Sequence, residues 1–288
     1  MLRISSANFL PGSMGTTLLL GLLKRESSDC KYAAHVNTTS SAERLRGELA
    51  KVKSASERVA ITSGKGQLLQ ATKGTDIVLL GVPPTDLGTL LGSEGLVEDL
   101  KGKIIVSMLA GVAVSQVEDA LVVKSARRFT KEDFKVARII PTLGAGKGDS
   151  VTLLAETGGS HMESVRSFLS QIGAIVPVPE SLMNAATAIG AAVHALSIVA
   201  IDAVTDASVA AGVPRSVAAS IAAESLRSGS GLMSGAGDER MTPEQVKAGM
   251  STPGGITLNA LVQLDANTRP GISSAVKNAI EYTQKMND

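Results

Sequence analysis

The sequence predicts an α/β fold in which a doubly wound, mainly parallel sheet is followed by an all-α domain. Up to about residue 180, short apolar runs of strand type alternate with helix-type segments, as in repeated βαβ units. Runs such as residues 77–80 are apolar at every position, which is typical of strands covered by helices on both faces. Beyond residue 180 only helical patterns remain, so we expect a second, helical domain.

The order of the predicted elements follows from these patterns. Strands are expected at residues 2–4, 32–36, 58–62, 76–82, 103–108, 136–140, 151–155 and 174–178. Helices are expected between them at residues 14–24, 42–52, 66–72, 114–120 and 162–172. The later helices are expected at residues 182–211, 216–226, from 242 onward, 257–265 and 270–285. Gly212 is a suitable C-cap, and Thr242 before Pro243 is a suitable helix start. The sequence therefore predicts two domains, residues 1–180 and 181–288.

Composition narrows the classes of function. The chain has 288 residues, 28 basic and 27 acidic, and a net charge of +1, so it carries no electrostatic footprint for nucleic acid or an anionic membrane. Its single cysteine, Cys30, excludes an intrachain disulfide and fits a reducing compartment. The Cys30 thiol is either a plain thiol or a nucleophile. The N-terminus lacks the pattern of a secretory signal, so we expect a cytoplasmic protein that handles a small molecule.

The most apolar window, residues 182–201, has the length of a membrane span. It contains Asn184, Thr187, His194 and Ser197, and we interpret it as a buried helix that does not cross a membrane. The helices of the second domain are rich in alanine and poor in large side chains, so each buries little surface alone. An intertwined dimer that shares a core is our hypothesis for this domain.

A Pro-Gly-Gly turn separates two helical patterns at residues 249–261. Pro253 ends the first helix, Gly254 and Gly255 permit unusual backbone angles, and Thr257 stands at the start of the next helix. Backbone N–H groups at a helix start favour a small anion such as a carboxylate. The alternative is an ordinary connection between two helices.

Several segments, in this order and with this spacing, resemble the pyrroline-5-carboxylate reductase family. The strongest is residues 252–257, Thr-Pro-Gly-Gly-Ile-Thr, which is similar to the family signature S-P-G-G-x-T. The supporting segments are residues 12–15, 106–112, 138–141, 148–152 and 211–215.

This resemblance implies a Rossmann-type domain followed by a helical dimerisation domain, in a homodimer or a ring of dimers. It implies an oxidoreductase that reduces 1-pyrroline-5-carboxylate, or a related cyclic imine, to L-proline or its analogue with NADPH or NADH. The turn that contains Thr252 would bind the substrate carboxylate through the N–H groups of Gly254, Gly255 and Ile256. The hydroxyl of Thr257 would lie at the ring nitrogen. The cofactor-binding residues implied are Gly12, Ser13, Met14, Gly15, Asn37, Val82, Pro83, Ala110 and Gly111.

The first turn departs from the dinucleotide fingerprint G-x-G-x-x-G. Aligned on Gly12 and Gly15, the first glycine position holds Leu10, or Asn8 if two residues are inserted, and Pro11 removes one backbone donor. After the second strand, Asn37 stands in a segment without an acidic residue, which favours NADP over NAD. The alternative for this segment is a polar loop that caps the helix at Ser41.

Other departures lie near the expected reaction site. Pro83 replaces a family lysine, and the segment 138–144 lacks the family asparagine. Residues 190–196 lack the family serines, and His194 stands at a proline position. His194 is either a proton donor to the imine nitrogen or a structural histidine at a subunit seam. No group of residues shows metal-ligand spacing, so we expect no metal.

Two other functions remain open from the residues. The scaffold would catalyse cofactor-independent acid–base chemistry, such as a cyclisation, if the altered first turn no longer binds a dinucleotide. It would be a non-catalytic oligomeric protein if the substrate turn has also lost its role. Titration with NADPH and NADH separates these functions from the reductase.

Overall fold

The structure, a computed structural model, describes residues 6–24, 30–52, 55–234 and 240–285. The chain divides into two compact units, Met1–Thr187 and Ala188–Asp288. Each unit is described by itself. The predicted domain boundary between residues 180 and 181 stays a prediction.

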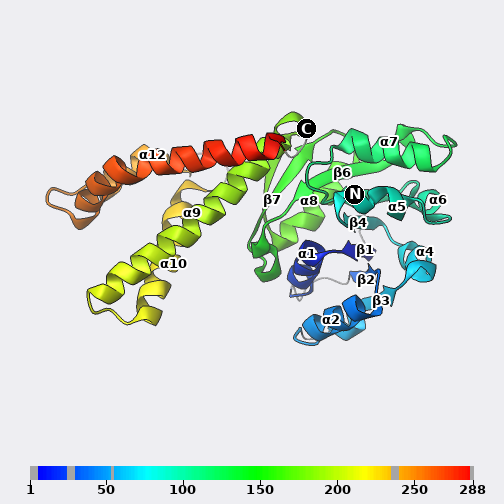
Figure 1. Cartoon of the computed structure of the whole chain (residues 1–288), viewed down its shortest axis with the longest axis horizontal. Coiled ribbons are helices and arrows are strands. Elements are labelled where there is room, and N and C mark those ends of the chain that lie inside the picture. Colours follow the sequence, from blue (N-terminus) through cyan, green and yellow to red (C-terminus); the bar gives the residue numbers. More distant parts are fainter. Residues whose placement is uncertain (1–5, 25–29, 53–54, 235–239, 286–288) are drawn as a thin grey trace. The chain divides into compact units, whose positions relative to one another are not determined.

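The first unit contains an eight-stranded sheet (Figure 1). The strand order is β3-β2-β1-β4-β5-β6-β7-β8. The strands are β1 (Ser6–Pro11), β2 (Lys31–Val36), β3 (Val59–Ser63), β4 (Ile77–Gly81), β5 (Ile104–Ser107), β6 (Lys135–Ile140), β7 (Ser150–Glu156) and β8 (Gly173–Pro179). All neighbours pair in parallel except β6 and β7. The predicted fold class, a mainly parallel doubly wound sheet followed by helices, is confirmed.

Seven of the predicted strands match β2 to β8 within one residue at each end. The strand predicted at residues 2–4 lies outside the described residues, and the first described strand, β1, begins at Ser6. Because the residues of β1 include Ser6 and Asn8, this strand lacks the apolar run that identified the others.

Helices cover both faces of this sheet. They are α1 (Ser13–Leu23), α2 (Thr39–Leu49), α3 (Ala55–Arg58), α4 (Leu68–Thr72), α5 (Leu87–Leu91), α6 (Leu96–Leu100), α7 (Val114–Lys124) and α8 (His161–Leu169). Short 3₁₀ turns are η1 (Lys65–Gln67), η2 (Pro84–Asp86), η3 (Lys131–Asp133), η4 (Leu143–Lys147), η5 (Ser170–Ile172) and η6 (Glu180–Leu182). The sequence analysis missed α3, α5 and α6, because helices of four or five residues are too short to show a period.

Two hydrophobic cores lie on the two faces. Strand β4 supplies both: Ile77 and Leu79 join the core under α1, α2 and α8, while Val78 and Leu80 join the core under α4 to α7. All four side chains are fully buried. Successive side chains of a strand point to opposite faces of the sheet. A strand covered by helices on both faces therefore needs an apolar residue at every position.

Helix α1 also makes a close backbone contact with η4. A Cβ on Gly21 would lie 1.9 Å from the carbonyl oxygen of Ala145, so only glycine fits this position of the helix. The Lys24 ammonium donates to the carbonyl of Gly146 at 2.6 Å and strengthens the same contact. The connection between β6 and β7 is thereby fixed against α1.

The second unit consists of long helices. Helix α9 (Met183–Ala210) begins in the first unit, and α10 (Arg215–Met233), α11 (Pro243–Met250) and α12 (Ile256–Lys285) follow. Gly212 has φ +91°, and the N–H of Val213 donates to the carbonyl of Ser208, which closes α9 as predicted. The Thr242 hydroxyl accepts from the N–H of Gln245 at 3.3 Å, so its predicted capping role is confirmed.

Two predicted helix ends are wrong. Helix α10 continues through Gly229 and Gly231 to Met233, past the predicted end at residue 226. The two helices predicted at 257–265 and 270–285 form one helix, α12, with Pro270 inside it. Proline removes one N–H donor but does not always end a helix. In the turn before Pro270, the side chains of Arg269 and Asp265 form an ion pair.

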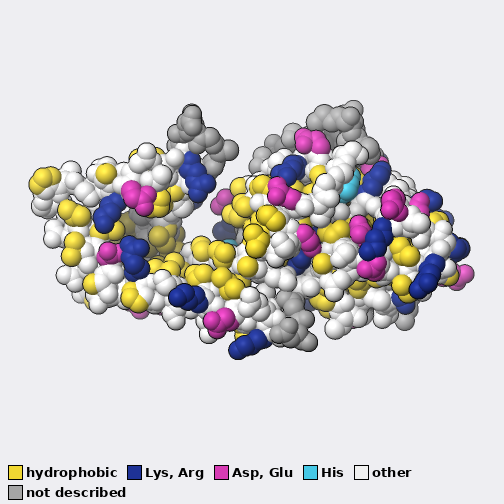
Figure 2. All heavy atoms as spheres, turned by 90° about the horizontal axis from the view of Figure 1, so that it is seen from above, with side chains coloured by type: hydrophobic (Ala, Val, Ile, Leu, Met, Phe, Trp, Pro, Cys, Tyr) yellow, Lys and Arg dark blue, Asp and Glu magenta, His cyan; other side chains and the backbone are white. Residues whose placement is uncertain are grey.

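This second unit has almost no apolar core of its own. Among its described residues, the buried apolar side chains are Ala188, Ala218 and Ala222. Large apolar side chains such as Ile198 and Val199, 69% and 66% exposed, lie on its surface, and yellow side chains are visible there in Figure 2. Apart from Met183 and Ala188, the expected burial of residues 182–201 is therefore not provided by this chain.

The length and apolarity of one described helix also meet the criteria for a membrane span. Among the described residues, one helix, spanning Glu180–Ala210, is long and apolar enough to cross a membrane, with a mean hydropathy of 1.8. Length and composition alone are weak evidence, because the core helix of an assembled protein satisfies the same criteria.

Candidate active site

The first strand-to-helix turn consists of a single residue, Gly12. Its N–H donates to the carbonyl of Gly81 at 2.9 Å, and a Cβ at Gly12 would lie 2.8 Å from the same oxygen. The Gly12 carbonyl accepts from the N–H of Thr16 at 3.1 Å, which begins α1. This glycine therefore allows β1, β4 and α1 to meet closely, as a dinucleotide turn requires.

The first turn of α1 holds the remaining predicted residues of this turn. Gly15 is buried, and Ser13 and Met14 precede it. In this described helix, no acidic residue lies in the first turn and no side chain caps the start. Its N–H groups and the helix dipole therefore favour a phosphate. Pro11, at the end of β1, is not one of these donors.

Asn37 and Val82 line one pocket of about 520 Å³, at the carboxyl ends of β2 and β4. Leu68 and Leu90 give it apolar walls, and Asp86 also lines it. The structure thus brings together two residues that the sequence analysis assigned to the cofactor. Pro83 follows directly and begins η2.

His35 lines the same pocket and is buried. Its Nδ1 lies 2.9 Å from the hydroxyl of Thr62 on the neighbouring strand. Burial lowers the pKa of His35, because the protonated ring would lose its hydration. His35 thus places a buried imidazole in the pocket that Asn37 also lines, and no role was expected for it from the sequence.

Thr38 caps the helix that follows Asn37. Its hydroxyl accepts from the N–H of Ser41 at 3.1 Å and caps α2. The cap therefore does not use the Asn37 side chain.

Ala110 and Gly111 form the exposed crest of the loop between β5 and α7. Gly111 has φ +75°, which favours glycine. The turns that contain Gly12, Asn37, Val82 and Ala110 follow β1, β2, β4 and β5, which are neighbours in the sheet. Because these strands are parallel, the turns lie at one edge of the sheet, where open α/β sheets bind ligands.

The predicted substrate turn lies at the start of α12 in the second unit. Gly254 has φ +70°, and the N–H of Gly255 donates to the carbonyl of Thr252 at 2.8 Å. This bond closes the turn, so Gly255 does not present a free N–H as the sequence analysis had expected. The first-turn N–H groups of α12, from Ile256 onward, are the donors that a helix start leaves for an anion. Ile256 and Thr257 are both exposed.

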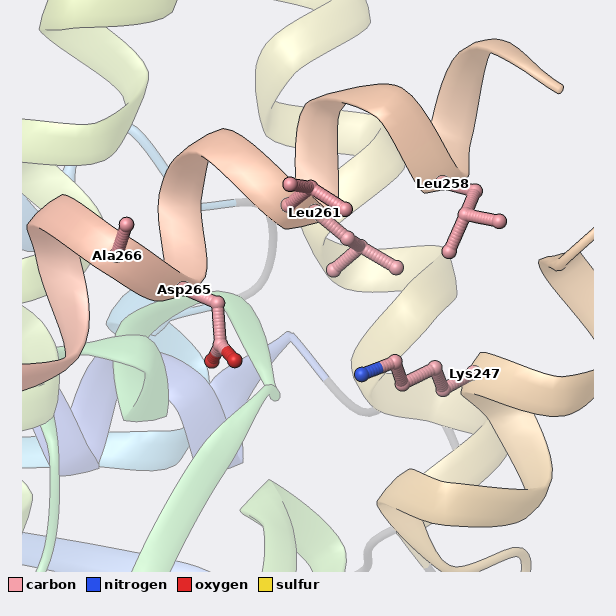
Figure 3. Close-up of a pocket in the computed structure, with 6 residues that line it drawn as sticks. Lys247, Leu258, Leu261, Asp265 and Ala266 are labelled. Atoms are coloured by element: carbon pink, nitrogen blue, oxygen red, sulfur yellow. The ribbon is translucent and has the colours of Figure 1, made fainter. Parts of the chain in front are cut away.

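A pocket of about 320 Å³ lies between α11 and α12, one turn after Thr257 (Figure 3). Leu258 and Leu261 form its apolar wall, and Lys247 and Asp265 lie across it from each other. Its lining is mainly apolar, and Thr257 is not part of it. We assign this pocket to packing rather than to chemistry.

His194 lies on α9 and is exposed. Its Nδ1 donates to the carbonyl of Gly190 at 2.8 Å, since a carbonyl can only accept. Both interpretations of His194 stay predictions. Among the described residues, no group of three or more His, Cys, Asp or Glu side chains has the geometry of a metal site.

An ion pair at the start of α7 was not expected from the sequence. Arg138 donates through Nη1 to Oε1 of Glu180 at 3.0 Å and through Nη2 to Oδ1 of Asn184 at 2.8 Å. Oε1 of Glu180 also accepts from the N–H of Val114, the first residue of α7. One signal was available: Ala113, before α7, has no side chain that could cap a helix.

A doubly wound sheet with this set of turns, followed by a helical unit, is an architecture that nicotinamide-dependent oxidoreductases use. In its helical part the chain is similar to the pyrroline-5-carboxylate reductase family. Residues 180–286 match the family described as pyrroline-5-carboxylate reductase dimerisation, and residues 11–111 match the one described as NADP oxidoreductase, coenzyme F420-dependent.

Whole-chain relatives show the same similarity, and solved structures share the fold. The pyrroline-5-carboxylate reductase of Lophium arboricola is 28% identical over 93% of this chain and 88% of its own, and that of Mycobacterium leprae is 28% identical over 94% and 91%. The fold is similar to the Plasmodium falciparum pyrroline carboxylate reductase with NADP bound, with a TM-score of 0.74, 19% identity and 100% of both chains covered. The Coxiella burnetii enzyme gives a TM-score of 0.78 at 16% identity, also over 100% of both chains.

Proposed function

We propose that this protein reduces 1-pyrroline-5-carboxylate to L-proline, or a closely related cyclic imine of specialised metabolism, with NADPH or NADH as the reductant. The observation that carries the proposal is the presence of two separate sets of groups in one chain. One set lies at the carboxyl edge of the sheet and suits a dinucleotide. The other is the Pro-Gly-Gly turn at the start of α12, which suits a carboxylate.

The cofactor residues present fit a dinucleotide despite Pro11. The single-residue turn at Gly12 leaves no space for a Cβ, and the start of α1 is free of acidic residues. Ser13, Met14 and Gly15 would hold the pyrophosphate through backbone N–H groups. Asn37, Val82 and Pro83 would hold the adenosine end, and Ala110 and Gly111 would lie nearer the nicotinamide. When bound, the nicotinamide supplies a hydride.

The chain's own residues would bind the substrate and protonate it. Ile256 and the turn at Gly254 would hold the substrate carboxylate at the helix start. The Thr257 hydroxyl would donate a hydrogen bond at the ring nitrogen and orient the imine carbon. His194 would donate the proton that the ring nitrogen gains.

We also propose that the protein acts as a homodimer or a ring of dimers in the cytoplasm, with domains at residues 1–180 and 181–288. The match to a dimerisation family and the exposed apolar side chains of α9 and α10 support this assembly. A partner subunit that covers α9 would also explain its apolarity without a membrane.

The first test is calorimetric titration of the wild-type protein with NADPH and with NADH. Micromolar binding of either supports the reductase. If neither binds at millimolar concentration, the reductase assignment fails and cofactor-independent acid–base chemistry becomes the better candidate.

The second test is imine reduction, followed at the nicotinamide absorbance, in Thr257→Ala and His194→Ala. Loss of one hydrogen bond to the bound imine should lower kcat/KM of Thr257→Ala by about tenfold or more, with an unchanged cofactor Kd. Thr242→Ala, which removes the cap of α11 in the same unit, is the matched control and should keep its kcat/KM. Unchanged kinetics in His194→Ala would remove His194 from the mechanism.

A further inference from the structure

We propose that Arg138 and Glu180 are positioning residues for the cofactor loop, which we define as residues 108–113 between β5 and α7. Their ion pair would hold Ala110 and Gly111 in the conformation that receives the dinucleotide. The proposal rests on the proposed function, because that function makes this loop part of the cofactor site.

The two ends of the cofactor loop are held by different contacts. At its start, the N–H of Met108 donates to the carbonyl of Leu80 at 3.0 Å. Leu109 donates to the hydroxyl of Ser107 at 3.4 Å, and its side chain is buried in the core under α7. The start of the loop is therefore fixed by the sheet itself.

The far end of the loop depends on a distant residue. The N–H of Ala113 donates to the Gln116 side chain at 2.7 Å, a local contact within α7. The next N–H, that of Val114, donates to Oε1 of Glu180 at 3.1 Å, across 66 positions of the chain. Glu180 thus supplies the negatively charged cap that Ala113 cannot supply.

Arg138 holds the Glu180 carboxylate in this place. It pairs in register with Ser107, the last residue of β5, and is 2% exposed. Its guanidinium contacts Glu180 through Nη1 and Asn184 through Nη2, so it joins the loop end to the first turn of α9. A planar guanidinium makes such two-point contacts with a fixed geometry.

This network has little redundancy. In the described part of the chain, Nε of Arg138 and Oε2 of Glu180 are buried without a hydrogen-bond partner. If Glu180 loses its charge, no second carboxylate in this network compensates Arg138, because Asn184 is neutral. A buried unpaired guanidinium is unfavourable, so Arg138 and the loop end would rearrange together.

Glu180→Gln tests the proposal, because glutamine keeps the size of the side chain and removes its charge. Hydrogen exchange of the cofactor-free protein should show exchange at residues 109–114 accelerated about tenfold or more, as a loop opens locally. The cofactor Kd should rise and kcat should fall, each about tenfold, because the loop is displaced from its productive position. Arg138→Lys keeps the charge but loses the two-point contact, so a smaller change in the same direction is expected.

Asp99→Asn is the matched control. It breaks the ion pair of Asp99 with Lys103, 2.7 Å long and also largely buried, which lies just before the other end of β5. We expect this variant to lower stability without changing exchange at residues 109–114, the cofactor Kd or kcat.

Two outcomes overturn the proposal. One is a Glu180→Gln variant that loses stability as Asp99→Asn does, with wild-type exchange in the loop and wild-type kinetics. The other is equal acceleration of loop exchange in both variants. If Glu180→Gln does not fold, Glu180→Asp keeps the charge on a shorter side chain and should show an intermediate loop exchange rate; a wild-type rate there would overturn the proposal. Exchange in the cofactor-free protein reports on the loop even if the wild type binds neither cofactor, so a failure of the proposed function is recognised separately.

Discussion

The two units of this chain differ in how they bury apolar surface. The sheet unit has a core on each face, and strand β4 contributes fully buried side chains to both. The helical unit has long regular helices, yet α12 has no buried residue among those described. Both units contain well-formed secondary structure, so regular backbone structure alone does not show where stability comes from.

The difference indicates which interactions each unit needs. The sheet unit buries its apolar side chains against itself, so its stability should not depend on protein concentration. The helical unit exposes them, so it needs a partner surface to bury comparable area. Four sets of substitutions test this difference, in order of decreasing expected effect.

Paired substitution of Ile198→Asp and Val199→Asp on α9 should abolish assembly. Two charges in an apolar interface should cost at least about 3 kcal/mol, or more than a hundredfold in the dimer Kd. Analytical ultracentrifugation would measure the change. Val123→Asp, at an apolar position of α7 that is 62% exposed in the sheet unit, is the control and should leave the assembly intact. An unchanged sedimentation coefficient for the double variant would contradict the partner requirement.

Leu79→Ala should destabilise the sheet unit. Leu79 is fully buried between the sheet and its helices, so its truncation should lower the free energy of unfolding by about 2–5 kcal/mol. Denaturant unfolding at two protein concentrations would measure the loss, which should be the same at both. A loss that grows on dilution would show that this unit also depends on the partner.

Gly12→Ala should weaken cofactor binding, because Gly12 has no room for a side chain. The added methyl group would lie 2.8 Å from the Gly81 carbonyl oxygen, so the Gly12 turn must move away from the end of β4, at a cost of about 1–3 kcal/mol. Cofactor affinity, measured by calorimetry, should fall about tenfold or more. Gly66→Ala is the control, since nothing lies within 4 Å of its Cβ position, and its affinity should equal that of the wild type.

His35→Gln should reduce the pH dependence of stability, the smallest of the four effects. Because burial lowers the pKa of His35, the unfolded state binds a proton more readily than the folded state. The wild type should therefore lose stability as the pH falls below the unfolded pKa of about 6.5. Urea unfolding at pH 7.5 and 5.5 would show a smaller loss in His35→Gln. The exposed His194, replaced in the same way, serves as the comparison from the helical unit.

The sequence predicted the sheet well because the strands that it located are rich in apolar residues and have clear ends. It placed β2 to β8 within one residue, while β1, with Ser6 and Asn8, gave no such run. It divided α12 in two because Pro270 is a strong local signal for a helix end. The tertiary context that keeps the helix continuous is not visible in a short window.

The cofactor roles of Gly12 and Asn37 came from segments that resemble a known family and stay predictions. Both residues lie in turns at the carboxyl edge of the sheet. Glu180 was missed because its role depends on Arg138 and Val114, which are distant in sequence and meet only in the folded unit. Contacts of this kind have no local signal in a single chain.

The close contact between Gly21 and Ala145 bears on how other members of this group can be recognised. The first glycine of the dinucleotide fingerprint has been lost in this chain, so it is a poor marker for divergent relatives. At Gly21 a side chain would overlap a backbone carbonyl, and at Gly144 it would lie 2.1 Å from the carbonyl oxygen of Asp149. Any substitution at Gly21 or Gly144 would require the backbone itself to move. A search pattern that requires both glycines should therefore find sequences that the nucleotide fingerprint overlooks.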